Sequence, residues 1–276
     1  MRPVRLYASA IALVLLAGAP GIAADAAKGA KAAKSSTASE STESKVDADA
    51  MEALDRMGAE LRSHQTFAVK SDVTNEDVLE DGQKLQYAGT VDIQARRPDR
   101  FKIEAVSDQR HRVFFYNGKT VTVFSPRQGY YATFDAPPTI RETLQQASQK
   151  YDIQLPLSDL FTWGTDPSMR ARIKSAFLVG PEKINGQACN HYAFRGERAD
   201  FQIWIQQNGP ALPCKLVITN RTDASMPQYT SVMHWSFPDS IPDNVFAFEA
   251  PADAKRIRLA GLAPGQEGGA LKGLKR

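Results

Sequence analysis

Two long stretches of this chain alternate apolar and polar side chains with a period of two, and this pattern constrains the fold more than any other feature. Between residues 65 and 134, for example, Phe101 and Ile103 lie on either side of Lys102. The same alternation returns between residues 174 and 248. Because successive side chains of a strand point to opposite faces, it predicts antiparallel strands that are buried on one face only.

Short turn signals separate these predicted strands. Asn117-Gly118 lies between two apolar runs and predicts a hairpin with a type I′ turn, which needs positive φ at both central positions. Asn185-Gly186 supplies another turn. Strands joined by such turns pair with their neighbours in the sequence, so a meander is expected.

Two segments have a helical period instead. Residues 47–63 carry apolar side chains every three or four positions, and Asp47 is a suitable N-cap. Thr139 and Glu142 have the spacing of a capping box at the start of a second helix. A sheet with one apolar face needs a cover, and the helices supply it. We therefore predict a mainly β (α+β) fold, in which a single curved antiparallel sheet forms a half-barrel covered by helices.

The two ends of the chain differ in composition from this central part. Arg2 and Arg5 precede an apolar run that is followed by small residues, as in a secretory signal peptide. The predicted organisation is a signal peptide over 1–26, a flexible Ala/Lys/Ser linker over 27–46, the half-barrel domain over 47–253 with a helical lid insert at about 138–173, and a basic, Gly-rich disordered tail over 254–276. The apolar run is shorter than the ~20 residues of a membrane-spanning helix. We expect an exported protein without a lipid anchor or a transmembrane span.

The net charge of +3 belongs to the ends of the chain. Acidic side chains slightly outnumber basic ones between residues 51 and 253, so the folded part gives no support to nucleic-acid binding. The basic tail is expected either to contact an anionic membrane surface or to remain a solvated end.

No catalytic or metal-binding motif is present. The four histidines, His64, His111, His191 and His234, are scattered, without an i, i+4 pair or an HExxH motif. The chain also lacks the Gly-x-Ser-x-Gly motif of α/β-hydrolases. We predict a protein that is not an enzyme and that has no cofactor and no metal ion.

Cys189 and Cys214 are the two cysteines of the chain. An oxidising compartment favours a disulfide between them. The predicted hairpins, however, place them on strands that are separated by a third. At ~4.8 Å per strand their Cα atoms would be nearly 10 Å apart, beyond the ~7 Å that a disulfide spans. This geometry argues against the bond.

Several segments together resemble a known family. They are Arg97-Pro98-Asp99-Arg100-Phe101, Tyr116-Asn117-Gly118-Lys119-Thr120, Gly129-Tyr130-Tyr131-Ala132-Thr133, Leu155-Pro156-Leu157-Ser158-Asp159-Leu160, Phe201-Gln202-Ile203-Trp204-Ile205 and Leu216-Val217-Ile218-Thr219. In these segments the chain is similar to the domain-of-unknown-function 2092 family of predicted periplasmic proteins, over about residues 50–258. The resemblance implies a periplasmic location and a fold similar to the lipoprotein carriers and receptors LolA and LolB.

The apolar face of the predicted sheet is the candidate functional site. The predicted lining of an apolar ligand cavity is Phe67, Tyr87, Phe101, Ile103, Phe115, Phe201, Ile203, Met233 and Trp235, and the predicted lid residues are Leu157, Leu160, Phe161 and Trp163. Met and aromatic side chains suit pliable apolar ligands such as acyl chains. The alternative is a closed, filled core.

The sequence thus leads to two hypotheses on function. In the first, the protein is a periplasmic, non-enzymatic carrier that binds a lipid or a lipoprotein acyl chain inside the half-barrel. In the second, it is a periplasmic sensor or protein-interaction module with a filled core.

Overall fold

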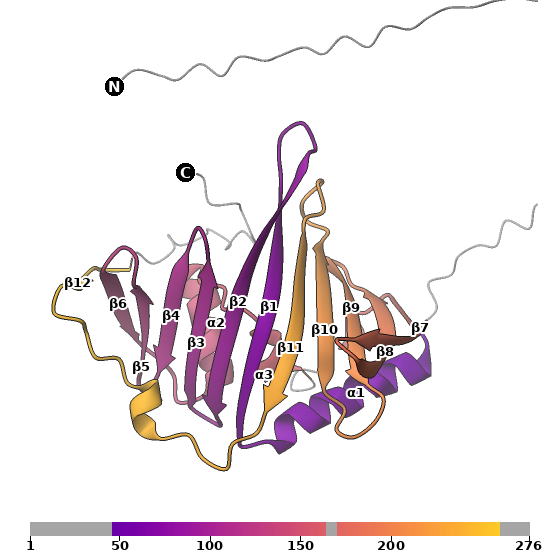
Figure 1. Ribbon diagram of the computed structural model, residues 1–276, viewed down its shortest axis with the longest axis horizontal. Coiled ribbons are helices and arrows are strands. Elements are labelled where there is room, and N and C mark those ends of the chain that lie inside the picture. Colours follow the sequence, from indigo (N-terminus) through magenta and orange to yellow (C-terminus); the bar gives the residue numbers. More distant parts are fainter. Residues whose placement is uncertain (1–45, 164–169, 260–276) are drawn as a thin grey trace, which may run out of the picture. The chain divides into compact units, whose positions relative to one another are not determined.

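The computed structural model describes residues 46–163 and 170–259 (Figure 1). The predicted signal peptide and nearly all of the predicted linker lie outside the described residues. So do residues 164–169 of the predicted insert and the chain beyond residue 259, where most of the predicted basic tail lies.

The first half of the described chain contains α1 (Ala48–Ser63), β1 (Thr66–Val78), β2 (Lys84–Arg96), β3 (Arg100–Ser107), β4 (His111–Tyr116), β5 (Thr120–Ser125), β6 (Tyr130–Asp135), α2 (Ile140–Tyr151) and α3 (Asp159–Thr162). The second half contains β7 (Ser175–Ile184), β8 (Gln187–Arg195), β9 (Ala199–Gln206), β10 (Pro213–Asn220), β11 (Gln228–Ser236), the 3-10 helix η1 (Asp243–Phe246) and β12 (Lys255–Arg256).

The twelve strands of the described residues form one open, curved sheet, which confirms the predicted fold class. Their order is β12-β6-β5-β4-β3-β2-β1-β11-β10-β9-β8-β7. The predicted meander is present within each half, from β1 to β6 and from β7 to β11. The sequence did not predict the seam between the halves, where β1 pairs with β11 so that Ala68 lies opposite Ser236. Such a pairing leaves no local signal, because its partners are far apart in the chain.

Both main helices begin as their sequences predict. The carboxylate of Asp47 accepts a hydrogen bond from the Asp49 N–H and caps α1. At α2, Thr139 Oγ1 accepts from the Glu142 N–H and caps the helix, and the Thr139 hydroxyl also donates to the Glu142 carboxylate. The predictions of a helix at 47–63 and of a second one from Ile140 are therefore confirmed.

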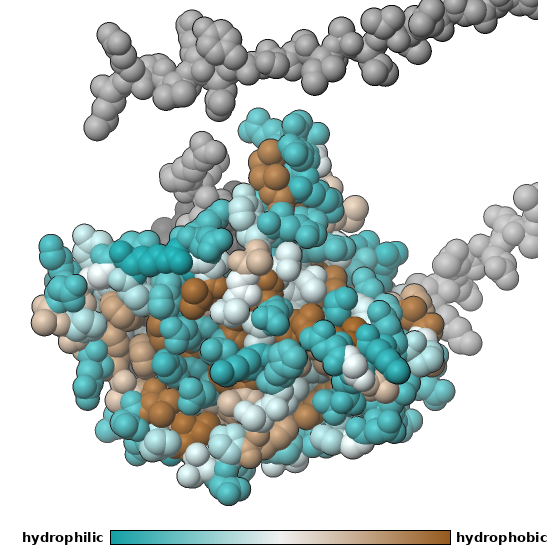
Figure 2. Space-filling model, in the orientation of Figure 1, coloured by the Kyte–Doolittle hydropathy of each residue, from teal (hydrophilic) through white to brown (hydrophobic). Residues whose placement is uncertain are grey.

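The two faces of the sheet differ as the alternation requires. The inner face, which packs against the helices, carries Phe67 and Val69 of β1 and Ile93 of β2, all at most 2 % exposed. The outer face carries charged residues such as Lys70 and its cross-strand neighbour Asp92. In the view of Figure 1, α2 and α3 lie behind the middle strands, and Figure 2 shows a mainly hydrophilic surface in the same orientation, with scattered apolar patches.

The turns at Asn117-Gly118 and Asn185-Gly186 differ from each other. At Asn185-Gly186 both residues have positive φ, 48° and 82°, as a type I′ turn requires. At the β4–β5 hairpin, Gly118 has a φ of 84° but Asn117 is outside the left-handed region. Instead, the Asn117 side chain accepts hydrogen bonds from the N–H groups of Lys119 and Thr120. The hairpin was predicted correctly, but its type I′ turn was not.

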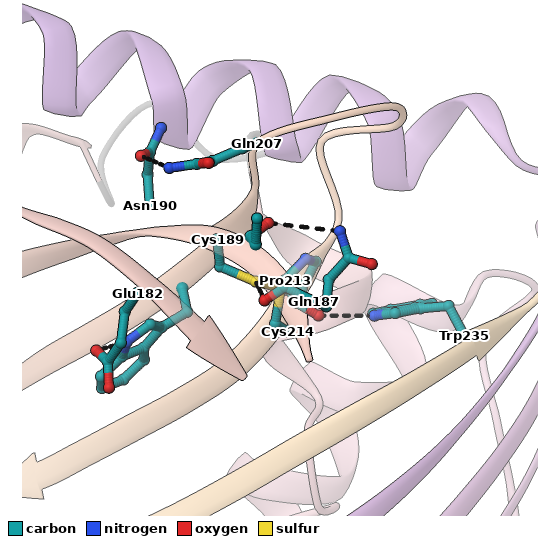
Figure 3. The surroundings of a disulfide bond; sticks show 10 residues. Glu182, Gln187, Cys189, Asn190, Gln207, Pro213, Cys214 and Trp235 are labelled. Atoms are coloured by element: carbon teal, nitrogen blue, oxygen red, sulfur yellow. Dashed lines mark hydrogen bonds between the residues drawn. A yellow bond between two sulfur atoms is a disulfide. The ribbon is translucent and has the colours of Figure 1, made fainter. Parts of the chain in front are cut away.

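Cys189 and Cys214 form a disulfide, contrary to the geometric expectation (Figure 3). They lie on β8 and β10 with β9 between them, as predicted, but their Cα atoms are only 7.0 Å apart. The register of β10 shifts between Pro213 and Lys215, so Cys214 is the extra residue of a β-bulge. A bulge bends its strand and redirects its side chains. The flat, regular sheet assumed from the sequence therefore overestimates the distance.

The C-terminal segment is ordered further than the sequence predicts. Lys255 and Arg256 form β12, which runs parallel to β6 opposite Tyr130 and Tyr131. The Lys255 N–H also donates to the carbonyl of Gly129. The predicted start of the disordered tail at residue 254 is therefore wrong. The composition of a basic segment does not reveal the backbone hydrogen bonds that the edge of a sheet offers it.

A candidate ligand-binding interior

Most of the predicted cavity residues lie together on the inner face. The seven that join the apolar core are Phe67, Phe101, Ile103, Phe201, Ile203, Met233 and Trp235. Phe101, Ile103 and Ile203 are fully buried, and Phe67 is 2 % exposed. In this structure these side chains are therefore packed against other side chains. The interior is therefore filled by side chains of the described residues.

Two predicted residues lie elsewhere. Phe115 faces the outer side of the sheet, because its neighbours Phe114 and Tyr116 pair with the inner residues Ile103 and Phe101. On the outer side its ring lies 5.4 Å from that of Phe248. Placing Phe115 in the inner lining was therefore wrong, because a distant segment also buries part of the outer face and makes β4 apolar on both faces.

Tyr87 is not part of the apolar core formed by the described residues. It pairs with Asn75 in the outer part of the β1–β2 hairpin, which extends well beyond the neighbouring strands (Figure 1). The alternation assigns Tyr87 correctly to the inner face. It carries no information on how far the helices reach along that face.

Residues 155–163, here called the cover, fill the middle of the interior. The four predicted lid residues all belong to it, and Leu157, Leu160, Phe161 and Trp163 are 1 to 8 % exposed. The ring of Phe161 lies 5.5 Å from Phe67 and 6.1 Å from Phe101. Trp163 lies 6.3 Å from Phe201. The cover thus spans both halves of the sheet with apolar side chains.

The backbone at the ends of the α2–α3 connection is strained. Asp152, which ends α2, has a φ of 53°, and Leu157 has a φ of 55°. The left-handed region costs a residue other than glycine roughly 1–2 kcal/mol. At Leu157 this cost is offset by burial of the side chain. Trp163 is also tied to α1, because Arg62 Nη1 donates to its carbonyl at 2.8 Å.

Two grooves adjoin this interior. The first, of about 430 Å³, reaches the cover at Phe161 and is otherwise lined by Arg97, Pro98 and the first turn of α2. Burial, and to a smaller extent the nearby Arg62, lowers the pKa of Arg97. The second groove, of about 380 Å³, is lined in part by Met233 and Trp235. Three residues of the predicted lining and lid therefore border a groove.

The sequence did not single out four polar residues of the interior. They are Ser71, Tyr229 and Ser231 on the inner face and Asp159 at the start of α3. A signal was nevertheless present, since Ser71 lies between Val69 and Val73 in the apolar phase of β1. A small hydroxyl residue at such a position is easily overlooked, because it disturbs the alternation very little.

Among residues 46–163 and 170–259, no three His, Cys, Asp or Glu side chains lie close enough together to hold a metal ion. His191 packs on the outer face instead, stacked on Trp204 with ring centroids 3.9 Å apart. Burial lowers its pKa, while Gln202 and Glu182 act in the opposite direction. Within the same ranges, no helix is both long and apolar enough to span a membrane.

Residues 50–260 match the model of a family described as "Predicted periplasmic protein (DUF2092)". No curated protein matches the chain significantly. Solved structures with a similar course of the chain include an uncharacterized conserved protein from Thermus thermophilus (12 % identity, 76 % of this chain and 99 % of that chain, TM-score 0.44).

Two further structures are the lipoprotein LppX from Mycobacterium tuberculosis (12 % identity, 71 % of this chain and 100 % of that chain, TM-score 0.44) and a LolA superfamily protein from Nitrosomonas europaea (11 % identity, 72 % of this chain and 97 % of that chain, TM-score 0.38). TM-scores this low carry no conclusion on function.

Proposed function

Since the chain belongs to the DUF2092 family of predicted periplasmic proteins, we propose that it works in the periplasm as a non-enzymatic carrier of an apolar ligand. The ligand is a lipid or the acyl chain of a lipoprotein. It binds on the inner face of the sheet, in the space that the cover fills in this structure.

The observation that carries this proposal is the nature of the cover. It contacts the sheet with apolar side chains such as Leu160 and Phe161, which an acyl chain can replace without leaving polar groups unpaired. The left-handed backbone at Leu157 favours release, because displacement of the cover relieves that strain. The groove at Phe161 gives a ligand its first access to the interior.

Tryptophan fluorescence tests whether a ligand displaces the cover. A variant with Trp204→Phe and Trp235→Phe leaves Trp163 as the single tryptophan. We expect its emission to shift to longer wavelengths when laurate or lauroylglycerol is added, because the indole, now 8 % exposed, enters water. In the matched control, Trp163→Phe and Trp235→Phe leave Trp204, which packs on the outer face, and its emission should stay constant.

Native mass spectrometry of protein purified from the periplasm, combined with lipid extraction, tests the same proposal without an added ligand. Co-purified lipid is the expected result. Absence of lipid, together with an unchanged Trp163 emission in the presence of both probes, contradicts the carrier function.

A second candidate function, a protein-interaction module, is favoured by one observation. The sheet ends at β7, where the consecutive residues Phe177, Leu178 and Val179 are each about half exposed. Beyond the bridge between Val46 and Ala176, this edge has no strand partner among the described residues, and a strand edge with apolar side chains can add a strand from another protein. A photo-crosslinking residue at position 178 should then give a discrete protein adduct in the periplasm. The same residue at position 183 serves as the control on this strand.

A further inference from the structure

Two serines occupy the most buried part of the inner face. Ser71 of β1 is 2 % exposed and Ser231 of β11 is fully buried. The strands pair so that Ser71 lies opposite Met233 and Ser231 lies opposite Val73. The two hydroxyls are therefore diagonal neighbours on one face, across the seam between the halves of the sheet. Apolar side chains surround them, and Tyr229 follows on the same face of β11.

The hydroxyls of Ser71, Ser231 and Tyr229 are buried, and none of them has a partner in good hydrogen-bond geometry among the described residues, although those of Ser231 and Tyr229 lie close together. Leaving a buried hydroxyl unpaired costs roughly 1–3 kcal/mol. Nearly all buried polar groups in proteins are paired, so three unpaired hydroxyls in one place need an explanation. Alanine would fill the position of either serine without this cost. The cluster therefore has the composition of a site whose partner is supplied from outside the chain.

The cluster is a set of hydroxyl donors on the sheet itself. Burial raises the pKa of Tyr229, and the neighbouring Ser231 hydroxyl acts in the opposite direction. These side chains belong to β1 and β11, so they stay in place when the cover moves.

We infer that Ser71, Ser231 and Tyr229 bind the neutral, oxygen-bearing head of an acyl ligand, such as the ester and hydroxyl groups of a monoacylglycerol. This inference rests on the proposed function, because the acyl chain of such a ligand takes the space of the cover side chains. The three hydroxyls donate to the oxygens of the head. A free fatty acid is disfavoured, because its carboxylate would be buried without a cationic partner among these residues.

Three probes with the same hydrocarbon chain separate recognition of the head from burial of the chain. Lauroylglycerol has the neutral head, laurate has a carboxylate, and dodecane has no head. Their affinities for the complete mature protein can be measured by displacement of N-phenyl-naphthylamine fluorescence at pH 7. We expect the wild-type protein to bind lauroylglycerol more tightly than it binds laurate or dodecane.

The variants Ser71→Ala and Ser231→Ala should show an unusual combination of effects. Each should raise the melting temperature of the free protein, because an unpaired buried hydroxyl is removed. Each should also weaken lauroylglycerol binding about five- to tenfold, as expected for one hydrogen bond, with dodecane binding unchanged. The matched control is Thr122→Val. The Thr122 hydroxyl is buried but bonded to Thr133 at 2.9 Å, so this variant should lower the melting temperature and leave all three affinities unchanged.

The inference is overturned if the serine variants change the affinities for lauroylglycerol and dodecane equally, or change neither, while the wild-type protein binds both. In that case the proposed apolar binding stands. If the wild-type protein binds none of the three probes, the proposed function fails and the inference fails with it.

Discussion

The carbonyl of Pro137 shows how single residues join the sheet to the helices. It accepts hydrogen bonds from two fully buried hydroxyls, Tyr116 of β4 at 2.5 Å and Thr143 of α2 at 3.1 Å. Tyr116→Phe or Thr143→Val alone should lower the free energy of unfolding by about 1 kcal/mol, because the carbonyl keeps one partner. The double variant should lose more than the sum, since the carbonyl is then unpaired. Urea denaturation of all four proteins measures the difference, and strict additivity would contradict this account.

Asp159 gives the stability of the protein a dependence on pH. Its pKa is raised in the folded state, so the folded protein holds this proton at a pH at which the unfolded chain has lost it. The contribution of Asp159 to stability is present at low pH. It is lost as the pH rises from about 4, the pKa of this group in the unfolded chain, through its raised pKa in the folded protein. Asp159→Asn should therefore stabilise the protein relative to wild type by an amount that grows between about pH 4 and pH 7.

Thermal unfolding at several pH values measures this effect. Asp152→Asn is the control, because Asp152 is exposed and lies in the same insert. If both variants show the same pH dependence relative to wild type, burial of Asp159 is not its cause.

Among the elements, β8 and β10 are held together by the disulfide across β9. The bond closes a loop with a sequence separation of 25 residues. A disulfide that closes a loop of this size stabilises the folded protein by about 3 kcal/mol. Cys189→Ala with Cys214→Ala should lower the free energy of unfolding by that amount in urea denaturation. A reductant should bring the wild-type protein to the same value and leave the variant unchanged. Equal stability of the variant and the oxidised wild-type protein would be evidence against the expected constraint.

Elements whose signals are local could be predicted from the sequence, and features that depend on distant partners could not. The caps of α1 and α2 use residues two or three positions apart, so Asp47 and Thr139 were recognised. An apolar residue such as Phe115 lies on the outer face because it packs against Phe248, which is more than a hundred residues away in the chain. The alternation identifies a candidate lining for the same reason that it identifies strands, but it does not reveal how the cover packs.

At the scale of the whole molecule, the seam between β1 and β11 decides how folding is completed. Each half is built from hairpins, which form quickly, whereas the seam joins residues far apart in the chain. Met233→Ala at the seam should therefore mainly raise the unfolding rate, with a loss of about 2 kcal/mol for a buried methionine. Ile103→Val, within the first half, should mainly slow folding. Stopped-flow chevron plots separate the two, and a slower folding rate for Met233→Ala would show that the seam forms early.

The same seam has a consequence for how the cell makes this protein. β1 is synthesised about 150 residues before β11, so its second edge finds its partner only when that strand follows. At ordinary rates of synthesis this takes on the order of ten seconds. Throughout that interval a long strand presents an unpaired edge to every other nascent chain. Until β11 is available, this edge of β1 is therefore open to pairing with other chains and to aggregation.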